Sequence, residues 1–210
     1  MMKKYKKTLI LTSILILLPI LVGIVFWNRL PDTIATHFGA NNEPNGWSSK
    51  PFVVFGMPLI LLALHWIAVA ATLNDPRKKN ISGKMFGILL WTVPVIAVAV
   101  LLMTYGYALG WNINIGTVVN LLVGIVFLVI GNYLPKTRQN YTVGLKIPWT
   151  LHSEENWNRT HRLSGWLLMA GGIVFILNAF LLWEVLLFVV ILIVVFVPIG
   201  YSFILYRKGI

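Results

Sequence analysis

Long uncharged apolar segments alternate with shorter polar connections along the whole chain. Each segment is close to the length, about 20 residues, that an α-helix needs to cross a hydrocarbon core roughly 30 Å thick. A backbone inside lipid must satisfy its own hydrogen bonds, which favours helices over single strands. We therefore predict an all-α membrane protein with six transmembrane helices, at residues 8–27, 51–73, 85–107, 116–134, 163–182 and 185–206.

Every charged residue lies outside these six segments. Only 11% of the 210 residues are charged and 58% are hydrophobic, whereas a soluble domain averages about 25% charged residues. In a soluble protein, the net charge of +11 would suggest nucleic-acid binding. The charges are too sparse for that here, and we predict no direct nucleic-acid contact. The absence of cysteine excludes disulfides, thiolate catalysis and cysteine-bound metal centres.

The basic residues are divided unevenly between the two sides of the predicted bundle. All of them except Arg29 and Lys50 lie at the two termini or in the connections 74–84 and 135–162. Cytoplasmic connections carry an excess of Lys and Arg, so this distribution predicts that both termini are cytoplasmic. The protein is then a multi-pass membrane protein, with loop 28–50 outside the cell and loop 135–162 inside it.

These two long loops divide the chain into three predicted parts. Residues 1–84 form an N-terminal two-span module with a structured extracellular loop, and residues 85–115 form the third span and its connection. Residues 116–210 form a C-terminal three-span module with the cytoplasmic loop 135–162. The other connections are short turns, so we expect function to reside in the two loops.

The outward loop has the composition of a compact lid. Residues 33–38 are rich in β-branched and aromatic side chains, which favours a short extended stretch or hairpin, and Asn45-Gly46 is typical of a tight turn. His37 lies near Asp32 and Glu43 in the sequence, but their spacing matches no metal-ligand pattern. We predict an extracellular recognition surface and no metal or other cofactor.

The inward loop contains a strong helix start. Ser153 can cap a helix whose first turn carries Glu154 and Glu155 near the positive end of its dipole. If that helix runs into the fifth span, Trp157, His161 and Gly165 share one face. Two interpretations remain open: an amphipathic collar lying on the lipid, or a docking site for a cytoplasmic partner.

Polar residues within the spans are few. For His65, Asn120 and Asn178 we favour hydrogen bonds between helices over a role in transport. The spans contain no carboxylate, and the chain has neither a nucleophile motif nor a metalloprotease motif, so we predict that it is not an enzyme. A small transporter or channel is the alternative function.

Several motifs resemble the SdpI family of bacterial immunity proteins. Residues 30–38 and 45–50 resemble the N-terminal domain of such proteins, and residues 131–136, 144–151 and 155–165 resemble their C-terminal region. The matching positions in the outward loop, as candidates for the toxin side, are His37, Asn45, Gly46, Trp47 and Lys50. Those on the inward side, as candidates for partner docking, are Asn132, Pro135, Gly144, Pro148, Trp149, Trp157, His161 and Gly165.

The resemblance implies a location in the bacterial plasma membrane and two partners besides the lipid bilayer. The first is a secreted, membrane-active peptide toxin, the sporulation-delaying toxin, against which such a protein protects the producing cell. The second is a cytoplasmic transcriptional autorepressor, which the family is thought to hold at the membrane when toxin is present. A folded outward loop and a basic, aromatic inward loop agree with such a relay, provided that the helices between them have two arrangements that toxin biases.

Overall fold

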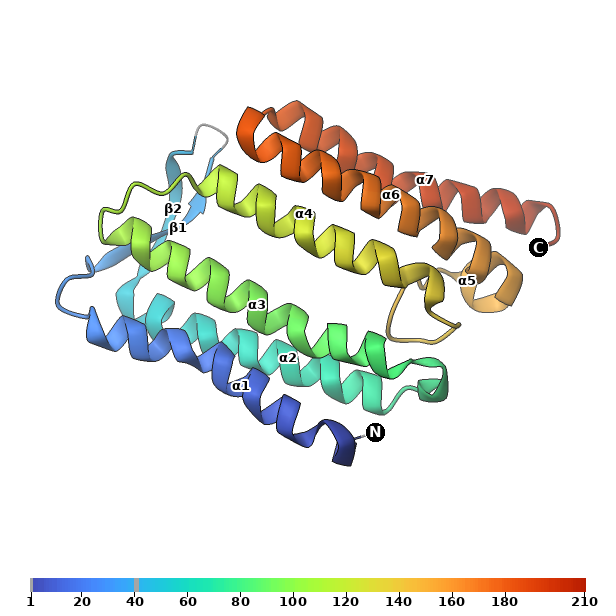
Figure 1. Cartoon of the computed structure of the whole chain (residues 1–210), viewed down its shortest axis with the longest axis horizontal. Coiled ribbons are helices and arrows are strands. Elements are labelled where there is room, and N and C mark those ends of the chain that lie inside the picture. Colours follow the sequence, from blue (N-terminus) through green and yellow to red (C-terminus); the bar gives the residue numbers. More distant parts are fainter. Residues whose placement is uncertain (1, 40–41) are drawn as a thin grey trace. The chain divides into compact units, whose positions relative to one another are not determined.

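The computed structural model describes residues 2–39 and 42–210, so residues 40 and 41 of the predicted outward loop lie outside the described part. Within the described residues, six helices are long and apolar enough to cross a membrane, which confirms the predicted number. The elements in chain order are α1 (Met2–Val25), β1 (Thr33–Phe38), β2 (Pro44–Ser49), η1 (Phe52–Gly56), α2 (Met57–Leu73), η2 (Lys78–Asn80), α3 (Gly83–Ala108), α4 (Ile115–Tyr133), η3 (Leu134–Lys136), α5 (Pro148–His152), α6 (Glu154–Leu181) and α7 (Glu184–Arg207) (Figure 1).

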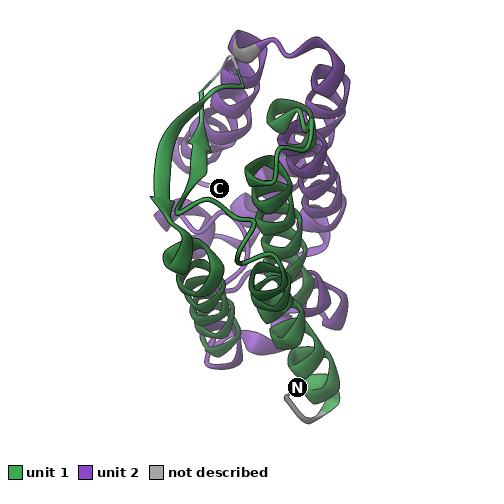
Figure 2. Cartoon of the chain, turned by 90° about the vertical axis from the view of Figure 1, so that its left-hand side faces the viewer, with its two compact units in different colours: residues 1–70, 89–118 green, residues 71–88, 119–210 purple. Residues whose placement is uncertain are grey.

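The chain forms two compact units (Figure 2). The first unit comprises residues 1–70 and 89–118, and therefore contains α1, the two strands and most of α2 and α3. The second comprises residues 71–88 and 119–210, with most of α4 and all of α5, α6 and α7. The connection between α2 and α3 thus belongs to the second unit, together with the predicted inward loop.

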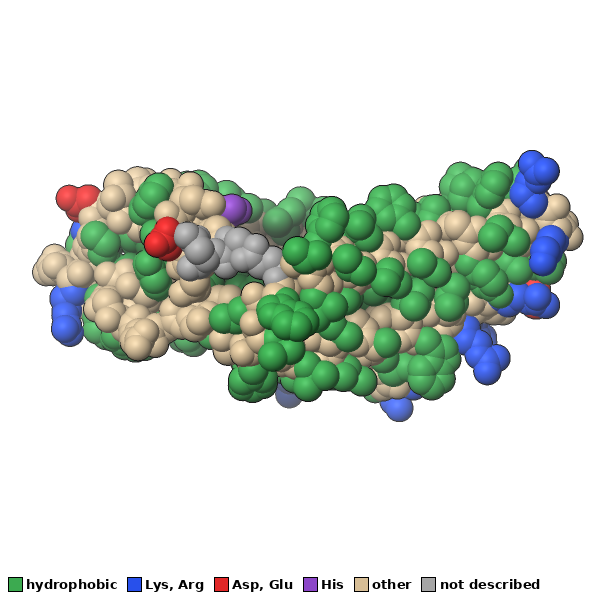
Figure 3. All heavy atoms as spheres, turned by 90° about the horizontal axis from the view of Figure 1, so that it is seen from above, with side chains coloured by type: hydrophobic (Ala, Val, Ile, Leu, Met, Phe, Trp, Pro, Cys, Tyr) green, Lys and Arg blue, Asp and Glu red, His purple; other side chains and the backbone are tan. Residues whose placement is uncertain are grey.

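Apolar side chains are exposed along the sides of the helices. On α7, for example, the exposed fractions of Val185 and Phe196 are 78% and 62%. In the space-filling view of Figure 3, hydrophobic side chains cover most of the visible helical surface, whereas the coloured Lys and Arg side chains lie toward helix ends. Water would not favour such a surface, but the hydrocarbon core of a bilayer does. The chain is a multi-pass membrane protein.

The predicted extended stretch 33–38 is β1, and it pairs with β2 in an antiparallel hairpin. The prediction that Asn45-Gly46 forms the turn was wrong, because both residues lie within β2, where Gly46 pairs with His37. The chain reverses between the strands instead, where Gly39 donates a backbone hydrogen bond to the carbonyl of Glu43. Gly46 is needed for close packing: a Cβ there would lie 2.9 Å from the Cβ of His37.

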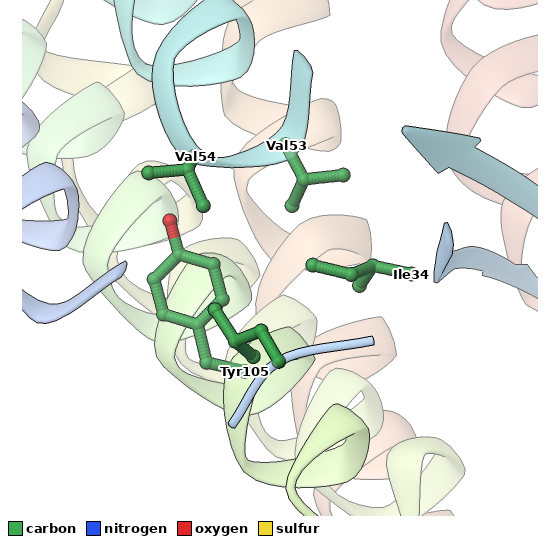
Figure 4. Packing of buried hydrophobic residues seen from close by; sticks show 5 residues of the cluster. Ile34, Val53, Val54 and Tyr105 are labelled. Atoms are coloured by element: carbon green, nitrogen blue, oxygen red, sulfur yellow. The ribbon is translucent and has the colours of Figure 1, made fainter. Parts of the chain in front are cut away.

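The hairpin is fixed to the helices of the first unit by a small hydrophobic core. Ile34 of β1 is buried together with Leu30, Val53, Val54 and Tyr105 (Figure 4). In that view the Tyr105 ring points its hydroxyl toward Val54, and Ile34 faces the same group from the hairpin. Ile34 therefore anchors the hairpin to η1 and α3.

In the second unit, α4 and α6 approach closely because glycines face each other. A Cβ on Gly131 would lie 2.8 Å from the carbonyl oxygen of Gly165, and a Cβ on Gly172 would lie 2.7 Å from that of Gly124. Small residues at such crossings let two helix backbones approach, which strengthens van der Waals packing in lipid.

The polar residues predicted to pair between helices do so. The Asn178 side chain of α6 donates to Asn120 of α4 at 3.3 Å. In the first unit, His65 of α2 is fully buried, and its Nε2 lies 3.2 Å from the hydroxyl of Thr12 on α1. These contacts confirm the predicted interhelical hydrogen bonds.

The fifth membrane-spanning helix, α6, begins earlier than the predicted span at 163–182. α6 starts at Glu154, and the Ser153 hydroxyl accepts a hydrogen bond from the Asn156 amide, as the sequence predicted. The helix includes charged first turns that precede the apolar span, as the predicted start at Ser153 allows. As a result, Trp157 and His161 belong to the same continuous helix as the apolar span.

Candidate functional sites

The base of the hairpin is held by Lys50. Its ammonium group donates to the backbone carbonyls of Leu30 at 2.9 Å and Trp27 at 3.3 Å, and it forms an ion pair with Asp32 at 3.1 Å. It also lies 5.2 Å from the centre of the Trp27 ring, a cation–π geometry. The Lys50 side chain is only 12% exposed. It therefore ties β2 to the chain that leaves α1, and little of it is accessible to a ligand.

The other outward candidates lie on the hairpin itself. His37 is exposed, and its Nδ1 is hydrogen bonded to the side-chain oxygen of Asn45 on the opposite strand. Trp47 follows on β2 and is 59% exposed. The structure thus brings His37, Asn45 and Gly46 together, and leaves Trp47 as a large apolar side chain that the hairpin exposes.

In the second unit, Trp157 and His161 are both fully buried and form a stacked pair. Their ring centres are 3.8 Å apart and the ring planes differ by 19°. The indole N–H of Trp157 donates to the carbonyl of Thr137 at 2.7 Å. The loop is therefore tied to the first turns of α6 through a buried aromatic side chain.

The hydrogen bonds of His161 determine its tautomer. Nε2 accepts from the backbone N–H of Leu145 at 3.0 Å, so the proton must be on Nδ1, which donates to the Trp157 carbonyl at 2.8 Å. Gly144 lies directly against the ring and has φ of +118°, a backbone conformation that side chains rarely adopt. His161 therefore acts as a neutral bridge between α6 and the loop backbone.

The second unit contains a buried carboxylate that no motif in the sequence indicated. Asp75, in the connection between α2 and α3, is only 3% exposed. It accepts hydrogen bonds from the backbone N–H groups of Arg77 at 2.7 Å and Tyr141 at 2.9 Å, and from the Thr142 hydroxyl at 2.6 Å. Two connections that are far apart in the sequence are thereby joined. A lone acid in a basic connection was the available signal.

Gln139 extends this junction in two directions. Its side-chain amide donates to the carbonyls of Thr150 at 2.7 Å and Leu151 at 2.9 Å in α5, and its side-chain oxygen accepts from Arg77. The Asn80 side chain donates to the Gln139 carbonyl at 2.7 Å. We call the connection 74–82 and the loop 135–152, joined in this way, the polar layer of the second unit.

The inward candidates fall into three groups by exposure. Trp157, His161 and Gly165 are buried, Gly144 and Trp149 are half-buried, and Asn132, Pro135 and Pro148 are exposed. The exposed charged side chains of the polar layer are all basic: Lys78, Lys79, Lys136, Arg138 and Lys146. A rigid, basic surface of this kind is suited to binding an anionic partner, and its buried residues give it its shape.

Comparison with known protein families gives two matches, one in each of the two regions described above. Residues 136–202 match the SdpI/YfhL protein family, and residues 14–62 match a domain of unknown function (DUF1648). The first match includes most of the polar layer and the second includes the hairpin.

The chain is also 26% identical to the immunity protein SdpI of Bacillus subtilis (strain 168), over 88% of this chain and 87% of that protein. No solved structure matches. The resemblance predicted from the motifs is therefore confirmed: residues 136–202 match the SdpI/YfhL protein family, and most of the chain is similar to an immunity protein.

Proposed function

We propose that this protein is an integral membrane immunity protein that protects a bacterial cell from a secreted, membrane-active peptide toxin. The observation that carries the proposal is the similarity to an immunity protein over 88% of the chain, which includes both the hairpin and the polar layer. The exposed apolar faces of the helices support action within the membrane, where such a peptide acts.

The hairpin is the proposed contact for the toxin. Lys50 and the core around Ile34 hold it rigidly, so binding there costs little ordering of the backbone. Trp47 offers a large amphipathic ring, the kind of side chain that often supplies much of the binding energy of an interface. His37 and Asn45 provide polar groups on the same hairpin.

Protection can be tested in a toxin-sensitive bacterium that expresses this protein. Survival after toxin exposure is compared among cells with empty vector, wild type, Trp47→Ala and Trp111→Ala, at equal membrane levels. Trp111 is the matched control, because it is 60% exposed in the same unit but lies outside the hairpin. We expect wild type and Trp111→Ala to protect and Trp47→Ala to lose most protection. Survival of wild-type cells no better than with empty vector would overturn the proposal.

The polar layer is the proposed docking surface for a cytoplasmic autorepressor. Its exposed basic side chains suit an acidic partner surface, and Asp75, Trp157 and His161 hold the backbone that presents them. Substitution of Trp157 or His161 is then expected to impair recruitment by disordering the loop, with membrane insertion retained.

Recruitment is measured as the membrane-bound fraction of a fluorescent candidate repressor, with and without toxin. Arg138→Glu reverses an exposed charge of the polar layer, whereas Lys84→Glu reverses one on α3 outside it. We expect only Arg138→Glu to release the repressor. If recruitment survives every substitution across 74–82 and 135–165, the docking proposal fails, while protection by the hairpin remains a separate result.

A further inference from the structure

The short helix α5 contacts the end of α7 (Figure 1). The Trp149 ring centre is 5.1 Å from that of Phe203 and 6.2 Å from that of Tyr206. Phe203 and Tyr206 are 42% and 49% exposed, and Trp149 is half-buried between α5 and α7. Three exposed cations are adjacent to these rings in the sequence. We call the whole set the α5–α7 patch: Lys146, Trp149, Phe203, Tyr206, Arg207 and Lys208.

The polar tips of this patch have no partners within the described residues 2–39 and 42–210. Neither the indole N–H of Trp149 nor the hydroxyl of Tyr206 makes a hydrogen bond there. Trp157 contrasts with this, because its indole N–H is buried and bonded to the Thr137 carbonyl. Trp149 and Tyr206 therefore hold their apolar rings against the protein and keep their polar atoms available to an external group.

The three cationic side chains also lack partners within the described residues. The side chains of Lys146, Arg207 and Lys208 form no ion pair in the described part of the chain. Of the acids nearest in sequence to α5, Glu155 is paired with Arg159 at 2.6 Å. The patch thus combines three free positive charges, two free hydrogen-bond donors and an apolar base.

We propose that the α5–α7 patch binds the headgroup of an anionic phospholipid. Trp and Tyr favour the headgroup level of a bilayer, where one end of the ring is apolar and the other is wet. Lys and Arg form charge-assisted hydrogen bonds with phosphate and are attracted to anionic lipid. α7 supplies exposed apolar side chains on which the acyl chains can lie.

This site places α5, which belongs to the polar layer, at the membrane surface. The Gln139 side chain donates to the α5 carbonyls of Thr150 and Leu151, so a lipid bound at Trp149 also restrains the loop that precedes it. The inference concerns lipid alone and holds whether or not the protein confers immunity. It selects the lipid-lying interpretation for α5 and assigns Lys146 of the polar layer to lipid. The basic surface of residues 74–82 and 136–142 is left for a soluble partner.

The experiment titrates phosphatidylglycerol or phosphatidylcholine into the purified full-length protein in detergent. Native mass spectrometry gives the affinity for the first lipid bound, and thermal unfolding gives the accompanying stabilisation. The site variant is Lys146→Gln/Arg207→Gln/Lys208→Gln. The matched control, Lys79→Gln/Lys84→Gln/Arg138→Gln, removes the same charge from exposed positions of the same unit. Circular dichroism confirms equal helix content.

We expect wild type to prefer phosphatidylglycerol, and the site variant to bind it about a hundredfold more weakly, since each of the three basic residues near anionic lipid contributes roughly a fivefold factor. The control is expected to retain most of the affinity. Trp149→Phe keeps an aromatic ring but removes the indole N–H, so it should lower the affinity for both lipids by a smaller factor.

Three results would overturn the proposal. Equal losses in the site variant and the control would mean that the charges act only through the general field of the protein. Equal affinity of wild type for both lipids would remove the requirement for an anionic headgroup. Unchanged lipid binding in the site variant, together with lost repressor recruitment, would assign the patch to a protein partner.

Discussion

The isosteric substitution Asp75→Asn tests whether the polar layer is held together by the buried carboxylate. Both oxygens of Asp75 accept hydrogen bonds, one from Arg77 and the other from Tyr141 and Thr142. An amide keeps one oxygen and places an NH2 group where the other oxygen was. Whichever way it turns, that NH2 faces a backbone N–H, so at least one hydrogen bond to a charged group is lost and a donor is left unpaired.

The size of the effect follows from these contacts. A hydrogen bond to a charged group contributes about 1.5–3 kcal/mol, and an unpaired buried donor costs about 1–3 kcal/mol. Because the two terms overlap, we expect the junction between residues 74–82 and 140–143 to weaken by about 2–4 kcal/mol. At about 1.4 kcal/mol per factor of ten, its opening then becomes roughly 30-fold to several hundredfold more frequent.

Hydrogen–deuterium exchange of the protein in nanodiscs measures this opening. The amides of residues 141–145 are expected to exchange faster by that factor in Asp75→Asn, while amides within α7 remain unchanged. Asp32→Asn is the matched control, since it removes one acid from a side chain that is 99% exposed, in the other unit. Unchanged exchange of residues 141–145 in Asp75→Asn, or equal acceleration in Asp32→Asn, would refute the idea that the Asp75 hydrogen bonds hold the two connections of the polar layer together.

Three further substitutions follow from the same geometry. Trp157→Phe keeps the ring on His161 but deletes the bond to the Thr137 carbonyl, so thermal unfolding should show a loss of about 1–3 kcal/mol. Gly165→Ala places a methyl group against the α4 backbone and should destabilise the protein by about 1–3 kcal/mol. In the control Gly200→Ala, the methyl group meets open space and should have no such effect. Equal melting temperatures of the two variants would contradict this prediction. Lys50→Met removes three hydrogen-bonding or ionic contacts at the hairpin base, and limited proteolysis between β1 and β2 should accelerate relative to wild type.

In the hairpin, the local sequence pattern predicted some features correctly, whereas others depended on tertiary packing. The β-branched and aromatic composition of residues 33–38 correctly predicted an extended segment. The position of the turn was predicted incorrectly, because Asn-Gly is a local preference and the packing of Gly46 against His37 requires it inside a strand. The sequence indicated Lys50 only as a candidate for the toxin side, and only the fold shows that the carbonyls after α1 converge on it.

The sequence by itself determined the six apolar helices, the helix start at Ser153 and the common face of Trp157, His161 and Gly165. These features depend on composition over one segment or on the repeat of a single helix, both of which are local. Only the tertiary structure decided that this face is buried, that Asp75 joins two connections and that Trp149 meets the end of α7. Each of these contacts joins residues far apart in the chain, and which distant donor meets which acceptor is set by how the helices pack, a property that no local pattern contains.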